Sequence, residues 1–88
     1  MVSGAPLLEF PCDYPLKVVG RRDAGLRARV HAIVLRHAPG LDASQVSERP
    51  SSNGAYTSIS YRLRAESRAQ VEALVTDLKA CEGVLLLL

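Results

Sequence analysis

Residues 56–64 read Tyr-Thr-Ser-Ile-Ser-Tyr-Arg-Leu-Arg, and this stretch decides the fold class of the 88-residue chain. Its larger apolar side chains occur at every second position, as they do on a β-strand with one buried face. The segment is therefore predicted to be a strand with two different faces. The core-facing set is Thr57, Ile59, Tyr61 and Leu63, and the opposite set is Ser58, Ser60, Arg62 and Arg64.

The segment before this strand predicts a hairpin. Residues 50–54 read Pro-Ser-Ser-Asn-Gly, and asparagine and glycine tolerate the positive φ angles of tight hairpin turns. Residues 41–49 alternate weakly around Val46 and supply the partner strand. The middle of the chain is thus a pair of antiparallel strands.

Further toward the N-terminus, residues 14–20 alternate as a half-buried strand that ends at Gly20. From Asp23, a predicted N-cap, the spacing changes to that of an amphipathic helix, which ends at Pro39 and Gly40. His37 is expected to be a packed residue hydrogen-bonded to backbone near the helix end. The apolar stripe of this helix consists of Leu26, Val30, Ile33, Val34 and His37.

Beyond residue 64, Ser67 and Gln70 fit a capping box at the start of a second helix, and Gly83 is its expected stop. Residues 84–88 are apolar throughout and predict a short final strand. The stripe of this second helix consists of Val71, Leu74, Val75, Leu78 and Cys81.

The element order is β-α-β-β-α-β, which predicts an α+β, ferredoxin-like fold. Right-handed crossovers place both helices on one face of a four-stranded antiparallel sheet with strand order 4-1-3-2. The first and third strands are then central. Their core-facing residues are Leu16, Val18, Ile59, Tyr61 and Leu63, and the open face carries Lys17, Val19, Ser58, Ser60 and Arg62.

Composition limits the class of protein. With 11 Lys and Arg against 9 Asp and Glu, the formal charge is +2, and 48% of the residues are hydrophobic. This length suits one domain over residues 1–88, with residues 1–13 as an irregular lead-in anchored by Phe10. No apolar stretch suits a membrane span or a signal peptide, so we expect a cytoplasmic protein with Cys12 and Cys81 as free thiols.

Two classes of partner are not favoured by the sequence. The expected open face has no aromatic rings to stack on bases, which argues against a nucleic-acid partner. Zinc would need more ligands at short spacing than His31, His37 and the two cysteines supply. We therefore expect no metal and no cofactor.

The first candidate site lies where the first strand meets the first helix. Backbone N–H groups and the helix dipole at this point favour a small anion, and arginine side chains can clamp a carboxylate or phosphate. Asp23 opposes this reading because its carboxylate competes for the same donors. A capped helix start with solvated arginines is the alternative. The candidate ligand-binding residues are Arg21, Arg22, Ala24 and Gly25.

The second candidate site is the hairpin loop, where hydroxyl and amide groups cluster beside an arginine. No histidine or carboxylate neighbours these serines in sequence, so nothing local activates a nucleophile. A turn selected for its Asn-Gly geometry explains the loop equally well. The residues concerned are Arg49, Ser51, Ser52, Asn53 and Gly54.

Three stretches of this chain resemble the YbeD-like family of small bacterial proteins. They are Phe-Pro-Cys-Asp-Tyr-Pro-Leu-Lys-Val-Val-Gly at 10–20, His-Ala-Pro-Gly at 37–40, and Arg-Pro-Ser-Ser-Asn-Gly-Ala-Tyr-Thr-Ser at 49–58. The resemblance implies a ferredoxin-like fold similar to ACT regulatory domains, with no assigned biochemical activity. It also implies a link to lipoate metabolism, because genes of this family often lie beside that of an octanoyltransferase.

Together these patterns predict a non-catalytic regulatory or protein-interaction module that senses a small anionic metabolite, self-associates or binds an enzyme partner. The apolar strand at 84–88 is the expected contact for a homo-oligomer or a heteromer. The alternative is an acylphosphatase-like hydrolase using Arg21 or Arg22 with Asn53. Since Asn53 falls in a predicted turn and not in a strand, an enzyme is the less favoured reading.

Overall fold

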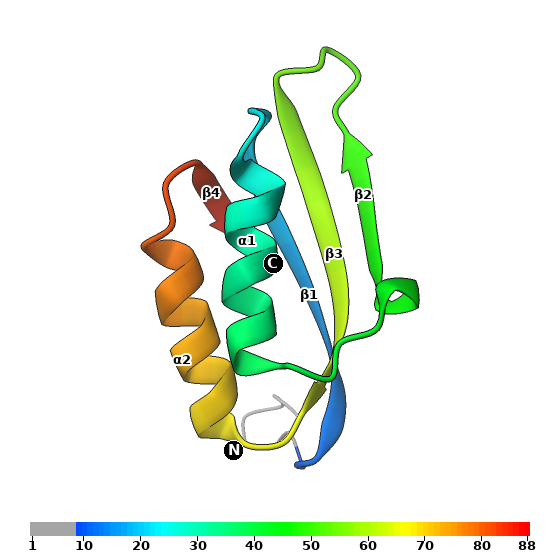
Figure 1. Ribbon diagram of the computed structural model, residues 1–88, viewed down its shortest axis with the longest axis vertical. Coiled ribbons are helices and arrows are strands. Elements are labelled where there is room, and N and C mark those ends of the chain that lie inside the picture. The colour runs from blue at the N-terminus through cyan, green and yellow to red at the C-terminus, as the bar shows by residue number, and fades with distance from the viewer. Residues whose placement is uncertain (1–8) are drawn as a thin grey trace, which may run out of the picture.

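The computed structural model describes residues 9–88, which form a four-stranded antiparallel sheet with two helices (Figure 1). The sheet order is β2-β3-β1-β4, so β1 and β3 are central. This arrangement confirms the predicted ferredoxin-like fold. In chain order the elements are β1 (Cys12–Arg21), α1 (Leu26–His37), the 3-10 turn η1 (Ala43–Gln45), β2 (Val46–Pro50), β3 (Tyr56–Ala65), α2 (Arg68–Lys79) and β4 (Val84–Leu87).

The register of the central strands separates a buried face from an open one. Lys17 of β1 lies opposite Ser60 of β3, as predicted for these neighbouring strands. The side chains that alternate with these two point to the core, where Val18 and Ile59 are fully buried. All five core-facing strand residues predicted from the alternation are at most 3% exposed: Leu16, Val18, Ile59, Tyr61 and Leu63.

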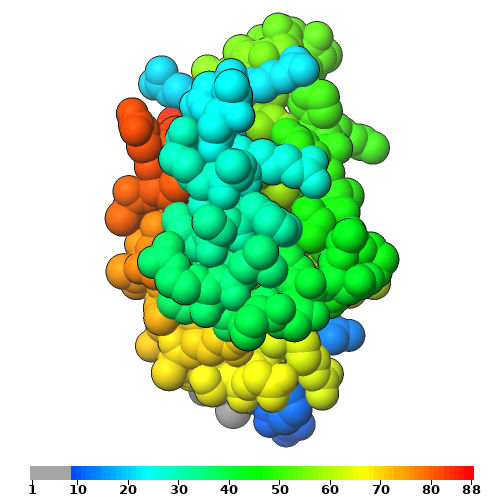
Figure 2. Space-filling view, in the orientation of Figure 1, coloured from blue at the N-terminus to red at the C-terminus, as the bar shows by residue number. Residues whose placement is uncertain are grey.

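Both helices cover the same face of the sheet (Figure 1). Side chains of α1 and α2 hide most of the strands in the view from that side (Figure 2). The buried side chains of α1 are those at the predicted helical spacing, and α2 buries Leu74 and Leu78. No helix of residues 9–88 lies on the opposite face of the sheet, and β2 lies beside α1 instead of beneath it.

Asp23 does not cap the first helix in the predicted way. The N-cap is Gly25, and the carboxylate of Asp23 accepts the backbone N–H of Gly25 over 2.8 Å, one turn before the helix begins. The sequence identifies a residue that can accept a backbone N–H near a helix start. The conformation of the turn before the helix decides which N–H that residue accepts.

The second helix has the predicted N-cap but only half of the predicted capping box, and it ends earlier than predicted. Ser67 is the N-cap and accepts the N–H of Gln70, whereas the Gln70 side chain accepts the N–H of Glu66. The helix ends at Lys79, so Cys81 lies beyond it. Gly83, with φ of 92°, sits in the turn that leads into β4 instead of directly after the helix.

The N-terminal lead-in is shorter than predicted. β1 begins at Cys12 and pairs with the end of β3, so residues 12 and 13 belong to the sheet. Phe10 is half-buried, and residues 1–8 lie outside the described part of the chain. Cys12 and Cys81 are both free thiols, as predicted.

His37 joins the two helices instead of binding backbone. Its Nε2 lies 2.7 Å from Oδ2 of Asp77 on α2. The backbone carbonyl of His37 accepts the side-chain amide of Gln70, also over 2.7 Å. The expected backbone partner for the imidazole was wrong because helical spacing reveals only partners on the same helix.

Candidate functional site

The start of α1 is already occupied by an internal carboxylate. Asp23 accepts the N–H of Gly25 and an Nη2 hydrogen of Arg29, the latter over 3.1 Å. These contacts, the Gly25 hydrogen bond foremost, lower the pKa of Asp23. Arg29 also donates to the carbonyl of Glu82 over 3.1 Å. The donors that an anionic ligand would use at Gly25 therefore serve the chain itself.

The four residues predicted to bind a ligand there do not converge on one point. Arg21 pairs with Tyr56 at the end of the central strands, and the N–H of Arg22 donates to the carbonyl of Ala55 over 3.1 Å. Ala24 is exposed in the turn before the helix, where Gly25 is the N-cap.

The hairpin loop is held together by its own polar groups. Oδ1 of Asn53 accepts the hydroxyl of Ser51 over 2.8 Å and the N–H of Ala55 over 3.0 Å. The hydroxyl oxygen of Ser51 in turn accepts the N–H of Tyr56. Gly54 has φ of 77°, in the region that favours glycine. Ser52 is exposed at the tip of the loop.

The structure brings the two predicted segments to the same end of the sheet (Figure 1). The hydrogen bond from Arg22 to Ala55 joins them, and the Arg22 guanidinium lies beside Gly54. Arg49, the fifth loop candidate, lies opposite Ser58 within β2 and faces away from the helices. The two segments are neighbours, although the sequence places them about thirty residues apart.

The open face of the sheet is strongly basic. The chain has a formal charge of +2 overall, but this face concentrates its cations, so the remaining surface is net negative. Among its cations, Arg64 alone forms an ion pair within residues 9–88, at 3.7 Å from Asp13. The charged side chains of this face are Lys17, Arg21, Arg49, Arg62 and Arg64, against the carboxylate of Asp13.

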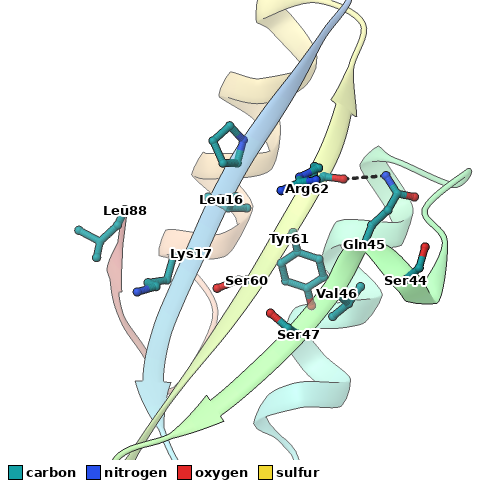
Figure 3. A pocket seen from close by; sticks show the side chains of 11 residues that line it. Leu16, Lys17, Ser44, Gln45, Val46, Ser47, Ser60, Tyr61, Arg62 and Leu88 are labelled. Carbon is teal, nitrogen blue, oxygen red and sulfur yellow. Dashed lines mark hydrogen bonds between the residues drawn. The ribbon is translucent and has the colours of Figure 1, made fainter.

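A shallow groove of about 680 Å³ crosses this face (Figure 3). Lys17 and Arg62 lie on its floor beside Ser60, and Leu88 lies at one end. The opposite end is formed by η1 and the first residues of β2. Gln45 holds that end in place because its side-chain amide donates to the carbonyl of Arg62 over 2.7 Å.

Sequence reasoning missed both the extent of this basic face and its one exposed ring. Tyr56 is 46% exposed and shares the face with Arg21, its partner across the strands. Alternation along β3 was sufficient to place Tyr56 there. Arg49 could not be assigned to this face in the same way, because its side depends on the register between β2 and β3.

A separate polar cluster lies on the helix side, between α1 and β2. Glu48 of β2 accepts the buried hydroxyl of Thr57 over 2.7 Å and pairs with Arg27 of α1 over 2.8 Å. The Thr57 hydrogen bond is the main cause that lowers the pKa of Glu48. Nearby, His31 stacks on Tyr61, and burial raises the pKa of Tyr61 to about 12.

Glu48 is expected to make folding stability depend on pH. Because its pKa is lowered in the folded state, its contribution is complete above the usual pKa of 4.5 and is lost as the pH falls through the folded value. Glu48→Gln should therefore reduce the fall in the urea midpoint between about pH 6 and about pH 3.

The matched control is Glu72→Gln, which removes one carboxylate from the exposed surface of α2. It should leave the fall in midpoint close to that of the unaltered chain. An equal reduction in both variants would mean that net charge, and not the contact with Thr57, causes the acid sensitivity.

No group of three or more histidine, cysteine, aspartate or glutamate side chains suited to a metal ion occurs within residues 9–88. Across the same residues, no helix is long and apolar enough to cross a membrane.

Comparison with known proteins gives a family and a fold. The family described as "Protein of unknown function (DUF493)" matches residues 5–88. A UPF0250 protein of Hahella chejuensis is 43% identical over 84 residues, which cover 96% of this chain and 92% of the relative. One of Shewanella sediminis is 49% identical over 78 residues, covering 89% and 86%.

Among solved structures, the C-terminal domain of the MgtC protein from Mycobacterium tuberculosis is similar with a TM-score of 0.65. The two share 19% sequence identity, and the similarity covers 93% of this chain and 89% of that domain. At this identity the likeness establishes a shared fold.

Proposed function

Because this chain belongs to the family of proteins of unknown function described as DUF493, we propose its role from its surface: a non-catalytic protein-interaction module that binds an acidic partner on its open sheet face. The observation that carries the proposal is the charge of that face, on which, among the side chains of residues 9–88, five cations stand against the one carboxylate of Asp13. Complementary charge on a partner speeds association and selects against basic surfaces.

The state of these cations supports the proposal. Within residues 9–88, Lys17, Arg21, Arg49 and Arg62 form no ion pair. Exposed helix cations such as Arg36 and Arg68 form none either, but the open-face cations share one surface. A charge without an internal partner gains more from a partner's carboxylate than one already paired. The free thiols Cys12 and Cys81 suit a cytoplasmic setting for such a module.

A protein partner is favoured over a small anion at the start of α1. The Asp23 carboxylate already occupies the donors there, through Gly25 and Arg29. A protein surface can engage several separated cations at once, which the spread of this face requires. Octanoate, lipoate or phosphate would engage one or two of them.

The test is photo-crosslinking in cells of the native host. A benzophenone amino acid in place of Ser60 lies on the open face, and the same group in place of Ala32 lies on the exposed side of α1. We expect Ser60 crosslinks to proteins at segments rich in aspartate and glutamate, identified by mass spectrometry. Lys17→Glu with Arg62→Glu should lower their yield about 10-fold, because reversed charges repel the partner.

The matched control is Arg36→Glu with Arg68→Glu, which reverses two exposed cations on the helices. Its crosslink yield should stay near that of the unaltered chain. Equal losses in both double variants would overturn the proposal, and so would the same products from Ala32. Crosslinks only to RNA, or only to a second copy of this chain, would replace it with nucleic-acid binding or self-association.

A further inference from the structure

The groove on the open face runs across the strands, and its lining changes from one end to the other. Cross-strand pairing places Ser47, Ser60, Lys17 and Leu88 in one row, with Lys17 and Leu88 joined by two backbone hydrogen bonds. Adjacent strands lie about 4.8 Å apart, so a row across four strands spans about 14 Å.

One end of this row is apolar, and its centre is cationic. Leu88 is 65% exposed. Lys17 follows, and Arg62 lies diagonally across from it on β3, two residues beyond Ser60. Side chains in such diagonal positions have Cβ atoms about 7 Å apart or less, so both cations can reach one carboxylate. At the far end, Ser47 adds a hydroxyl group.

The hydroxyl groups on the groove floor are available to a ligand. Ser47 and Ser60 form no side-chain hydrogen bond with another residue of the described chain, in contrast to Ser51 and Thr57. A serine hydroxyl beside a cation can donate to a carboxylate that the cation has already attracted.

We propose that this groove receives a short, extended, acidic segment of the partner protein, with an apolar side chain on Leu88 and carboxylates at Lys17 and Arg62. This inference rests on the proposed function and adds the form of the partner segment and the order of its side chains. An extended chain advances about 3.3 Å per residue, so four to five residues fill the groove. Alternate side chains of that segment face the sheet, which sets the order apolar, acidic, acidic at every second position.

The layout of the face favours a peptide over single-stranded RNA. Bases need aromatic platforms, and the row beneath the groove carries serine, lysine and leucine side chains. The one exposed ring on this face, Tyr56, is the first residue of β3. It lies beside Arg21, away from the groove, and does not line it.

The experiment is an NMR titration of the full chain with blocked five-residue peptides. The probe is Leu-Ser-Glu-Ser-Glu, and its controls are Leu-Ser-Gln-Ser-Gln and Ser-Ser-Glu-Ser-Glu. We expect amide shifts of β1 and β3 around Lys17 and Arg62. The Kd should rise at least about 10-fold for the glutamine peptide, because charge-assisted bonds are lost. It should rise about 3-fold or more for the peptide without leucine, because less apolar area is buried.

A variant separates the apolar contact from the charge. Leu88→Ser should abolish the difference between the leucine and serine peptides while leaving the effect of glutamate intact. Lys17→Glu with Arg62→Glu should remove binding of the two glutamate peptides, and Arg36→Glu with Arg68→Glu should not.

Two results would overturn the groove assignment while leaving the interaction module standing if open-face crosslinks to acidic proteins are found. One is binding to the open face that depends on the peptide's glutamates but has the same Kd with or without the peptide's leucine and with or without Leu88. The other is the absence of shifts at the groove with millimolar peptide. Stronger shifts with an oligouridylate, centred on Tyr56 and Arg21, would overturn it in favour of RNA.

Discussion

Replacing Leu78 with alanine is expected to lower the free energy of unfolding by about 2–5 kcal/mol, the range for truncating a buried leucine. Leu78 is fully buried in α2 and belongs to the hydrophobic core cluster between the helices and the sheet. The loss combines the apolar area returned to water with the cavity left behind, which close-packed neighbours fill only in part. Urea denaturation followed by circular dichroism measures it.

Arg62→Ala is the matched control, because Arg62 is exposed on the open face and forms no ion pair within residues 9–88. Its effect should stay within about 0.5 kcal/mol. A Leu78→Ala variant as stable as Arg62→Ala would mean that α2 does not pack on the sheet as described. Such a small effect on Arg62→Ala also allows the groove variants to be read as changes in binding.

Replacing Gly20 with alanine is expected to destabilise the fold by about 1–3 kcal/mol through overpacking. A Cβ atom at this position would lie 2.7 Å from the carbonyl oxygen of Gly83 and 2.8 Å from Leu26 Cδ2. The carbonyl cannot move away freely, because it accepts the N–H of Arg21 over 2.9 Å where β4 joins β1. The substitution therefore strains the pairing of β4 as well as the packing of α1.

Gly40→Ala provides the comparison at a glycine with open surroundings. A Cβ atom there would meet nothing within 4 Å, so the change should be neutral or slightly stabilising through the unfolded state. Thermal unfolding of the two variants under the same conditions gives the contrast. If Gly20→Ala unfolded at the same temperature as Gly40→Ala, β4 would be able to shift away from β1 at little cost in stability.

The role of Gly20 marks a limit of what the sequence predicts. Alternation over residues 14–20 indicated a strand that ends at a glycine. The reason that glycine is needed lies sixty residues away, in the turn at Gly83. The same limit applies to His37, whose partner Asp77 comes from the other helix. Local spacing reports which side of an element is buried, and it does not report what lies against that side.

The candidate site shows the same division. The arginines near residue 21 and the polar loop at residues 51–54 stood out in the sequence because each concentrates polar groups locally. The structure places both at one end of the sheet, where Arg22 and Ala55 are hydrogen-bonded. The donors at the helix start are engaged by Asp23, and those of the loop by Asn53. Arg21 lies on the open face instead, together with Lys17 and Arg62.

The sequence by itself determined the kinds of element, their order and the side of each that faces the core, because alternation and helical spacing act over a few residues. With the right-handed crossover rule, that was sufficient for the ferredoxin-like topology. Only the tertiary structure decided which cations share a surface. Lys17, Arg49 and Arg62 come from three strands, and the register that aligns Lys17 with Ser60 and Arg49 with Ser58 joins them. A register shift of one residue would turn one strand's side chains to the other face, so the basic groove exists only through long-range pairing.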